Sequence, residues 1–109
     1  MSNPRLLLAM TTCADQAAAE RLARALVEHR LAACVSAGSP ITSVYPWQDR
    51  VETETEVPLT IKTAPHRLAE LKRFIEEHHE CDVPELLIVP VVDGAQAYFQ
   101  WAEDWTGND

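Results

Sequence analysis

The densest group of potential metal ligands in the sequence lies near residue 80. Imidazole, thiol and carboxylate side chains follow one another within a few positions, at His78, His79, Cys81, Asp82 and Glu85. Imidazole and thiolate ligands suit copper and zinc, whereas carboxylates suit harder ions. The spacing matches no closed zinc motif, and the chain has no Cys-x-x-Cys pair. We therefore predict a weak, open site for copper or another divalent metal ion, with His79, Cys81 and Glu85 as ligands, and no organic cofactor.

The same stretch has a second interpretation. A helix is expected to end close to the two histidines, and positive charge is favoured at a helix C-terminus. One histidine would then close that helix end, and the acidic side chains would simply be solvated. The sequence leaves both interpretations open.

The three cysteines are Cys13, Cys34 and Cys81. An odd, sparse set of thiols argues against a disulfide framework and is typical of a reducing compartment, so we expect a cytoplasmic protein. Cys34 is a further candidate metal ligand, although a buried, small apolar side chain is the commonest role of a free cysteine. Cys13 precedes a predicted helix, whose N-terminus can lower a thiol pKa, but packing or a loop position is the simpler role.

Composition and charge exclude several classes of partner. The 109 residues correspond to one domain spanning 1–109, with 47% apolar and 24% charged residues, as in ordinary soluble domains. The formal net charge is −8 and Lys and Arg do not cluster, so nucleic acid and anionic membranes are not expected partners. The apolar run Leu6–Met10 is too short for a signal peptide, and no run is long enough for a membrane span.

Four strands are predicted from apolar runs and alternation, at residues 6–12, 31–47, 51–63 and 86–92. Gly38-Ser39-Pro40 breaks the second strand, and residues 48–50 turn the chain into the third. Pro58 indicates an edge or a bulge within the third strand.

Helical spacing predicts an amphipathic helix at 16–30, capped by Asp15, and a second helix from Pro65 that stops at 82–84. A last helix follows Asp93 as its cap, and the tail from Thr106 is expected to fray. The order β-α-β-β-α-β plus a C-terminal helix predicts an α+β, ferredoxin-like split βαβ sandwich.

The central β-hairpin is too long for the layer that covers it. Strands of about 15 residues reach about 50 Å, whereas the first helix spans only about 23 Å. The far end carries Tyr45 and Trp47, which are expected to be covered, and long strand edges pair readily with other chains. We therefore expect oligomerisation, with Tyr45, Trp47 and Trp101 at the interface.

One face of the third strand carries Glu52, Glu54 and Glu56. Such a carboxylate array is expected to be solvated or to lie at an interface, where Lys62 or Arg50 of a neighbour would pair with it.

No catalytic motif is present. G-x-S-x-G, P-loop and H-E-x-x-H patterns are absent, and residues 12–15 lack the arginine of an acylphosphatase anion loop. A Cys–His nucleophile pair is left open, but nothing specific favours it. We expect a protein that is not an enzyme.

Several collinear segments together resemble the CutA divalent-cation-tolerance family. They are Thr11-Thr12-Cys13, Leu31 to Val35, Ser43 to Trp47, Lys62-Thr63, His79 with Asp82 to Leu87, and Pro90, Gly94, Tyr98 and Trp101. The match extends over about residues 5–105. The resemblance implies a ferredoxin-like homotrimer in which the long hairpins pair strands between subunits. It also implies copper binding, a part in tolerance to divalent cations, and no catalytic reaction.

Two departures from the family pattern stand out. Glu80-Cys81 replaces the usual Pro-Tyr after His79, which adds a thiol, and Asp49 replaces a glycine at the hairpin tip. The sheet arrangement is also similar to that of PII-type signalling proteins. The alternative function is therefore a trimeric regulator or scaffold that binds a small ligand or an unidentified protein partner in the clefts between subunits.

Overall fold

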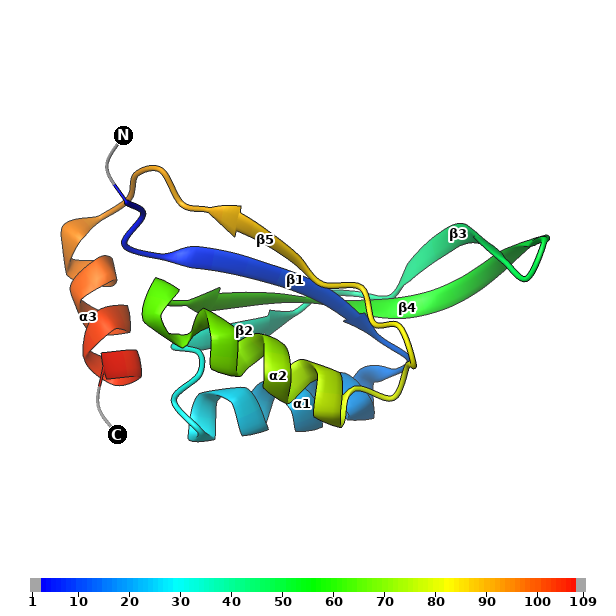
Figure 1. The fold of residues 1–109 in the computed structure, drawn as a ribbon, viewed down its shortest axis with the longest axis horizontal. Coiled ribbons are helices and arrows are strands. Elements are labelled where there is room, and N and C mark those ends of the chain that lie inside the picture. The colour runs from blue at the N-terminus through cyan, green and yellow to red at the C-terminus, as the bar shows by residue number, and fades with distance from the viewer. Residues whose placement is uncertain (1–2, 108–109) are drawn as a thin grey trace.

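The computed structural model describes residues 3–107, and its elements follow the predicted order with the second strand divided. They are β1 (Leu7–Cys13), α1 (Gln16–Glu28), β2 (Cys34–Ala37), β3 (Ile41–Trp47), β4 (Arg50–Thr63), the 3-10 turn η1 (Pro65–Arg67), α2 (Leu68–His78), β5 (Leu87–Pro90) and α3 (Gln96–Gly107). The molecule measures 45 × 30 × 24 Å. Its long axis runs from α3 to the tip of the β3–β4 hairpin (Figure 1).

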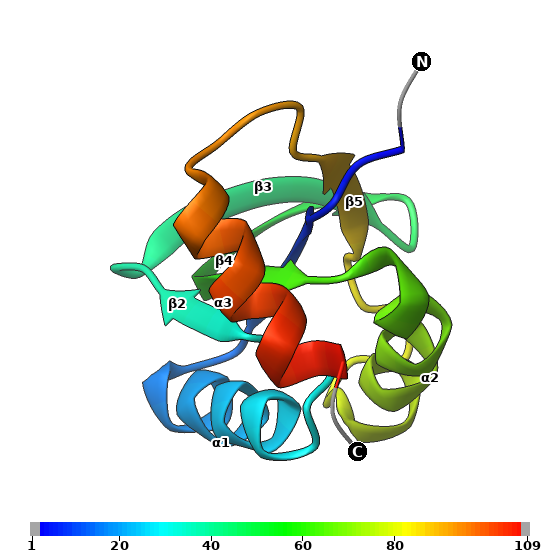
Figure 2. The same ribbon diagram turned by 90° about the vertical axis from the view of Figure 1, so that its left-hand side faces the viewer.

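The strands form one antiparallel sheet in the order β2-β4-β1-β5, and β3 continues beside the outer half of β4. Helices α1 and α2 cover one face of the sheet, and α3 crosses the end remote from the hairpin (Figures 1 and 2). This order confirms the predicted α+β, ferredoxin-like fold.

The main core lies between the sheet and the two covering helices. Every second residue of β1 is buried, and the inner half of β4 alternates in the same way. The largest buried apolar side chains in this layer are Leu22, Leu26, Leu31, Leu59, Ile61, Leu71 and Ile75. Burying each of them stabilises the fold by about 1.5–3 kcal/mol. The ends of β1 and α2 are thereby held in fixed positions.

The ends of α1 are set by specific hydrogen bonds. Asp15 is the N-cap, as predicted, and its Oδ1 accepts from the Ala18 amide at 2.8 Å. The helix ends at Glu28, two residues earlier than expected, because Arg30 takes a left-handed conformation with φ 58°. The Leu31 and Arg30 amides then donate to the carbonyls of Leu26 and Val27, both at 3.0 Å. This is a Schellman arrangement, and it directs the chain into β2.

The C-terminal helix differs from the prediction at both ends. It begins at Gln96 instead of after Asp93, whose Oδ1 accepts from the neighbouring Gly94 amide. Thr106 does not fray: it is buried, and its carbonyl accepts from Arg67 Nε at 2.7 Å and from His66 Nε2 at 3.1 Å. The remainder of the predicted frayed tail, residues 108–109, lies outside the described residues.

The β3–β4 hairpin projects beyond the helical layer (Figure 1). Trp47 pairs with Arg50, so Gln48 and Asp49 form a two-residue turn, and both have positive φ, at 50° and 63°. Positive φ at both positions is the geometry of a type I′ turn. The turn predicted at 48–50 is therefore present.

Pro58 lies in a central strand instead of at an edge. Its carbonyl accepts from the Gly38 amide at 2.9 Å, so its nitrogen faces the gap between β2 and β3, where no strand needs an N–H donor. A Cβ on Gly38 would meet the Pro58 ring at 3.0 Å. The break in the strand at 38–40 thus explains why a proline is tolerated at this position of a central strand.

Candidate functional site

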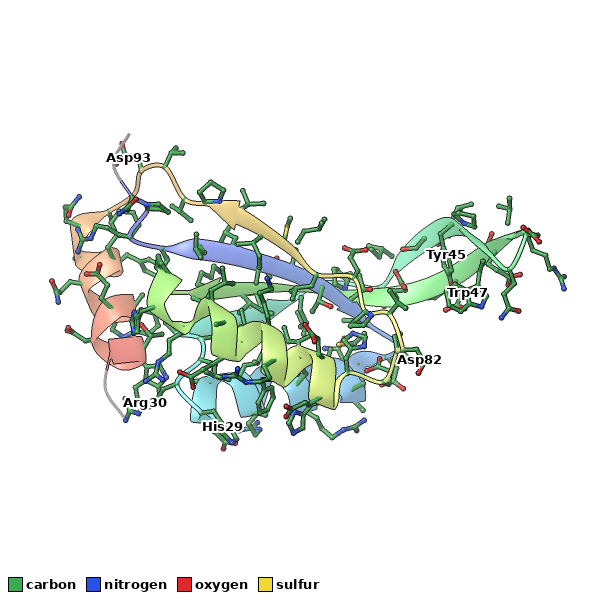
Figure 3. The ribbon with its side chains drawn as sticks, in the orientation of Figure 1. His29, Arg30, Tyr45, Trp47, Asp82 and Asp93 are labelled. Carbon is green, nitrogen blue, oxygen red and sulfur yellow. The ribbon has the colours of Figure 1, made fainter. Side chains whose placement is uncertain are left out.

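A groove separates the hairpin from the loop that follows α2. We call it the hairpin groove; it has a volume of about 640 Å³. Figure 3 shows Tyr45 and Trp47 on the hairpin and Asp82 on the facing loop. The lining is Thr12, Ser43, Val44, Tyr45, Trp47, Glu52, Glu54, Glu56, His79, Cys81, Asp82, Val83 and Glu85. The volume lies within the range of small-molecule sites.

The three glutamates of the hairpin have partners within the same chain. Ser43 Oγ donates to Glu56 at 2.6 Å, and Arg50 Nε lies 3.7 Å from Glu52. The Tyr45 hydroxyl donates to Glu54, and this bond, followed by burial and the charge of Glu54, raises the pKa of Tyr45 to about 12. The carboxylate array therefore also organises the hairpin itself. Pairing with a neighbour's Lys62 or Arg50 remains a prediction.

His79 joins the end of β1 to the loop after α2. Its side chain is only 1% exposed. The Nε2–H donates to the Thr12 carbonyl at 2.6 Å, and Nδ1 accepts from the Cys81 amide at 3.0 Å. The two backbone partners place a proton on Nε2 and a lone pair on Nδ1.

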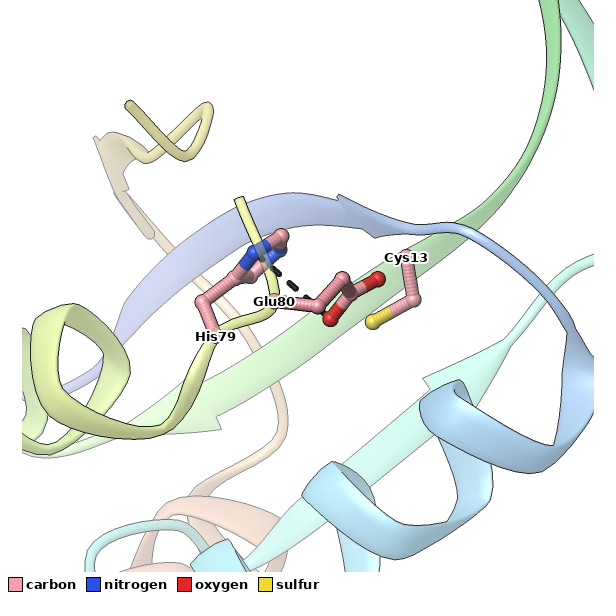
Figure 4. A group of neighbouring side chains, drawn as sticks. All are labelled: Cys13, His79 and Glu80. Carbon is pink, nitrogen blue, oxygen red and sulfur yellow. Dashed lines mark ion pairs between the residues drawn. The ribbon is translucent and has the colours of Figure 1, made fainter. Parts of the chain in front are cut away.

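Cys13, His79 and Glu80 are the one group of three potential metal ligands that the described residues bring together (Figure 4). Their ligand atoms all lie within 4.8 Å of one another. Glu80 Oε2 lies 3.7 Å from His79 Nδ1, while Oε1 accepts from the Ala14 amide at 2.7 Å. We call these three residues the ligand cluster.

The Cys13 thiol is protonated in this setting. Burial raises its pKa to about 12, and the negative charge of Glu80 adds to the effect. A helix N-terminus therefore does not produce a reactive thiolate here. A metal ion at Cys13 would have to displace the thiol proton.

Three of the four predicted ligands, His79, Cys81 and Glu85, line the hairpin groove, but only His79 also belongs to the ligand cluster. Cys81 and Glu85 are exposed. Cys34 lies on β2 opposite Lys62, with its Sγ 4.0 Å from Ser36 Oγ, and lines neither the groove nor the cluster. His78 ends α2, and its Nδ1–H donates to the Phe74 carbonyl at 2.9 Å, as the helix-end interpretation expects.

The predicted ligand set lacked Cys13 and Glu80. Glu80 directly follows His79, so it is a sequence neighbour of a residue that the prediction named. Cys13 is 66 residues away from His79, and only the return of α2 to the end of β1 brings the two together. The ferredoxin-like order brings the end of β1 and the loop after α2 to the same end of the sheet, and this was the signal available in the sequence.

The three residues predicted for an interface are accessible in the single chain. Trp47 and Trp101 are each 51% exposed, and Tyr45 is half-buried. No helix within residues 3–107 has both the length and the apolar character that crossing a membrane requires.

The model of one protein family, the CutA1 divalent ion tolerance protein, matches residues 7–105. The chain belongs to the CutA1 family. A curated CutA1-family member, the divalent-cation tolerance protein CutA of Thermus thermophilus, is 37% identical over 90% of this chain and 95% of its own length. The human protein CutA is 39% identical over 90% of this chain and 55% of its own length. The chain thus spans only about half of this animal relative, and 66% of a frog homologue.

Solved CutA1 structures have the same fold. The structure of CutA1 from Shewanella sp. SIB1 superposes with a TM-score of 0.91 at 36% identity, covering 95% of this chain and 97% of that one. Because the family and the fold agree over nearly the whole chain, the resemblance found in the sequence is confirmed. Of the two residues that the sequence comparison marked as departures from the CutA pattern after His79, Glu80 belongs to the ligand cluster and Cys81 follows it directly.

Proposed function

We propose that this CutA1-family chain binds a copper-class divalent cation, such as Cu²⁺ or Zn²⁺, at Cys13, His79 and Glu80. The ligand cluster is the observation that carries the proposal. The names of the family and of the Thermus thermophilus relative support a link to divalent cations in general. The resemblance to the family supports copper in particular.

The residues of the cluster fit such an ion. Sulfur, imidazole nitrogen and carboxylate oxygen form a mixed set that favours copper and zinc over Mg²⁺ or Ca²⁺, which prefer oxygen cages. The His79 Nε2–H bond to a backbone carbonyl is the usual support of a metal-binding imidazole, because it fixes the ring and leaves the lone pair on Nδ1, where the Cys81 amide now donates. Three ligands leave a coordination position open, so we expect micromolar affinity at best.

A titration with Cu²⁺ tests this assignment. Wild type should bind with a stoichiometry near one ion per chain, and Cys13→Ser should weaken binding at least tenfold. Cys34→Ser is the matched control, because Cys34 lies outside the cluster, and it should bind like wild type. Loss of binding in Cys34→Ser with full binding in Cys13→Ser would move the site to Cys34.

We also propose that the protein is a homotrimer. Two separate sets of large apolar side chains are exposed. The hairpin carries Ile41, Val44, Trp47 and Val51, and the body carries Leu87, Val89, Val92, Tyr98 and Trp101. Two different patches favour a head-to-tail interface, which repeats from chain to chain until a ring closes. The family resemblance favours a ring of three, in which Tyr45 and Trp47 contact a neighbour's Trp101 region.

The mass in solution tests the assembly. Light scattering should give three times the chain mass of 12.2 kDa at micromolar concentration. Trp47→Asp should dissociate the assembly, because it places a charge where aromatic surface is buried. A clean wild-type monomer would contradict the proposal.

A second function is favoured by the hairpin groove. A PII-like trimeric regulator or scaffold would bind a small ligand or a protein partner there, at a cleft between subunits, and metal would be incidental. The size of the groove and its mixture of aromatic and acidic side chains support this alternative. Native mass spectrometry after gentle purification distinguishes the two, since a retained organic ligand favours the regulator and a retained metal ion favours the cluster.

We propose further that the protein is cytoplasmic, is not an enzyme and does not bind nucleic acid or membranes. The free thiols support a reducing compartment, and the raised pKa of Cys13 disfavours a Cys–His nucleophile pair. The net charge of −8 repels phosphate-rich partners. Hydrolysis of a generic thioester by the wild-type protein that is abolished in Cys13→Ser would contradict the non-enzymatic proposal.

A further inference from the structure

The Nδ1 atom of His79 has one lone pair, and a backbone N–H already uses it. The Cys81 amide donates to Nδ1 at 3.0 Å, while Nε2–H is committed to the Thr12 carbonyl at 2.6 Å. An imidazole with its proton on Nε2 has no second acceptor site. A metal ion and the Cys81 amide therefore compete for the same electron pair.

We propose that the Cys81 amide bond to His79 is a latch that metal binding releases. The inference rests on the proposed metal site at Cys13, His79 and Glu80. Occupancy of Nδ1 detaches the Cys81 backbone from the imidazole, whereas the bond from Nε2–H to Thr12 stays in place. The histidine thus stays bonded to the Thr12 carbonyl of β1, while the loop that follows it loses its hydrogen bond to the imidazole.

Released in this way, the loop changes one wall of the hairpin groove. Cys81, Asp82, Val83 and Glu85 form that wall and face the aromatic side chains of the hairpin. Val83 is 77% exposed, and residues 79–86 form no strand or helix. The latch is therefore one of the contacts that hold this segment, together with the Glu80 bond to the Ala14 amide and the packing of Leu86 on the core. Metal occupancy is thereby converted into a change of the surface that a partner or a neighbouring subunit would meet.

Metal binding releases one proton, and the balance does not require that it come from His79. The imidazole carries its proton on Nε2 before and after binding, and exchanges a hydrogen bond at Nδ1 for a metal bond. The Cys13 thiol loses the one proton that is released, the sulfur–metal bond forms, and the proton passes to solvent. Glu80 keeps one carboxylate oxygen on the Ala14 amide.

Amide-resolved hydrogen exchange by NMR, with and without Zn²⁺, tests the latch in the wild-type assembly. Saturating Zn²⁺ should accelerate exchange of the Cys81 amide by at least about tenfold, and Mg²⁺ should not. The Ala33 amide, which donates to Lys62 within the sheet, is the internal control and should not change. If Zn²⁺ binds and Cys81 stays protected, the latch is wrong although the metal site stands. If neither Zn²⁺ nor Cu²⁺ binds, both are wrong.

Two variants separate the amide from the thiol. Cys81→Pro lacks both the N–H and the thiol, whereas Cys81→Ser lacks only the thiol. Because it lacks the competing amide, Cys81→Pro should bind Zn²⁺ about three- to tenfold more tightly than Cys81→Ser. This change in affinity corresponds to the net free energy of one hydrogen bond. Equal affinities in two folded variants would contradict the latch. If Cys81→Pro does not fold, the wild-type exchange experiment decides.

Discussion

Replacing His79 with alanine should destabilise the protein even without metal. The side chain is 1% exposed, and its removal leaves the Thr12 carbonyl and the Cys81 amide without their partner. Each unsatisfied polar group costs about 1–3 kcal/mol, and the solvent near Cys81 reduces the second cost. With the lost packing, we expect His79→Ala to lower the free energy of unfolding by about 2–4 kcal/mol per subunit.

Two further variants calibrate that loss. His79→Gln keeps an N–H near the Nε2 position but has no acceptor at Nδ1, so it should lose about half as much. His78→Ala is the matched control: His78 is exposed and stacks on Phe74 at 4.0 Å, so its removal should cost about 1 kcal/mol or less.

Guanidinium unfolding at one fixed protein concentration, followed by circular dichroism, measures these differences. If His79→Ala unfolds at the same midpoint as His78→Ala, the two hydrogen bonds of His79 do not hold the loop, and the reasoning about this residue fails.

Three other perturbations test the fold. The double variant Gln48→Asn, Asp49→Gly should raise the free energy of unfolding by about 1–2 kcal/mol, because Asn-Gly suits the positive φ angles of the turn. An unchanged thermal midpoint would argue against a type I′ turn. Gly38→Ala should lower the free energy of unfolding by about 1–3 kcal/mol, because the new Cβ would lie 3.0 Å from the Pro58 ring. Gly107→Ala is the control and should be tolerated, because its Cβ would meet nothing within 4 Å. Equal melting temperatures of the two variants would refute this packing. Hydrogen bonds from Arg5 lower the pKa of Glu103 in the folded protein. The stability that these bonds contribute is therefore present above the ordinary carboxyl pKa, and it is lost as the pH falls through the lowered pKa of the folded state. Glu103→Gln should flatten that acid dependence of thermal melting, and an identical pH profile would show that the pair contributes nothing.

Local patterns were sufficient to predict the fold. Alternation from Val51 to Thr63 identified β4, and Asp15 identified the start of α1, because both signals depend only on neighbouring residues. The length of the hairpin and its turn also followed from local signals. The positions that differed depend on tertiary contacts instead: Arg30 ends α1 in a left-handed conformation, and basic side chains from elsewhere hold the last turn of α3.

The candidate site was harder to predict for the same reason. The sequence pointed to the stretch around His79, which does lie in the ligand cluster. It could not show that Cys13 supplies the thiol while the nearer Cys81 faces the groove, because that choice depends on how α2 returns to β1. Pro58 shows the same limit, since its place in a central strand makes sense only with the gap at Gly38 opposite it.

X-ray absorption at the zinc edge tests the central claim most directly, because it counts the sulfur ligands of the bound ion. Wild type loaded with one Zn²⁺ per chain should show one sulfur at about 2.3 Å together with nitrogen and oxygen ligands. The sulfur contribution should disappear in Cys13→Ser and persist in both Cys81→Ser and Cys34→Ser. A sulfur ligand that persists in Cys13→Ser and disappears in either of the other two variants would contradict the account.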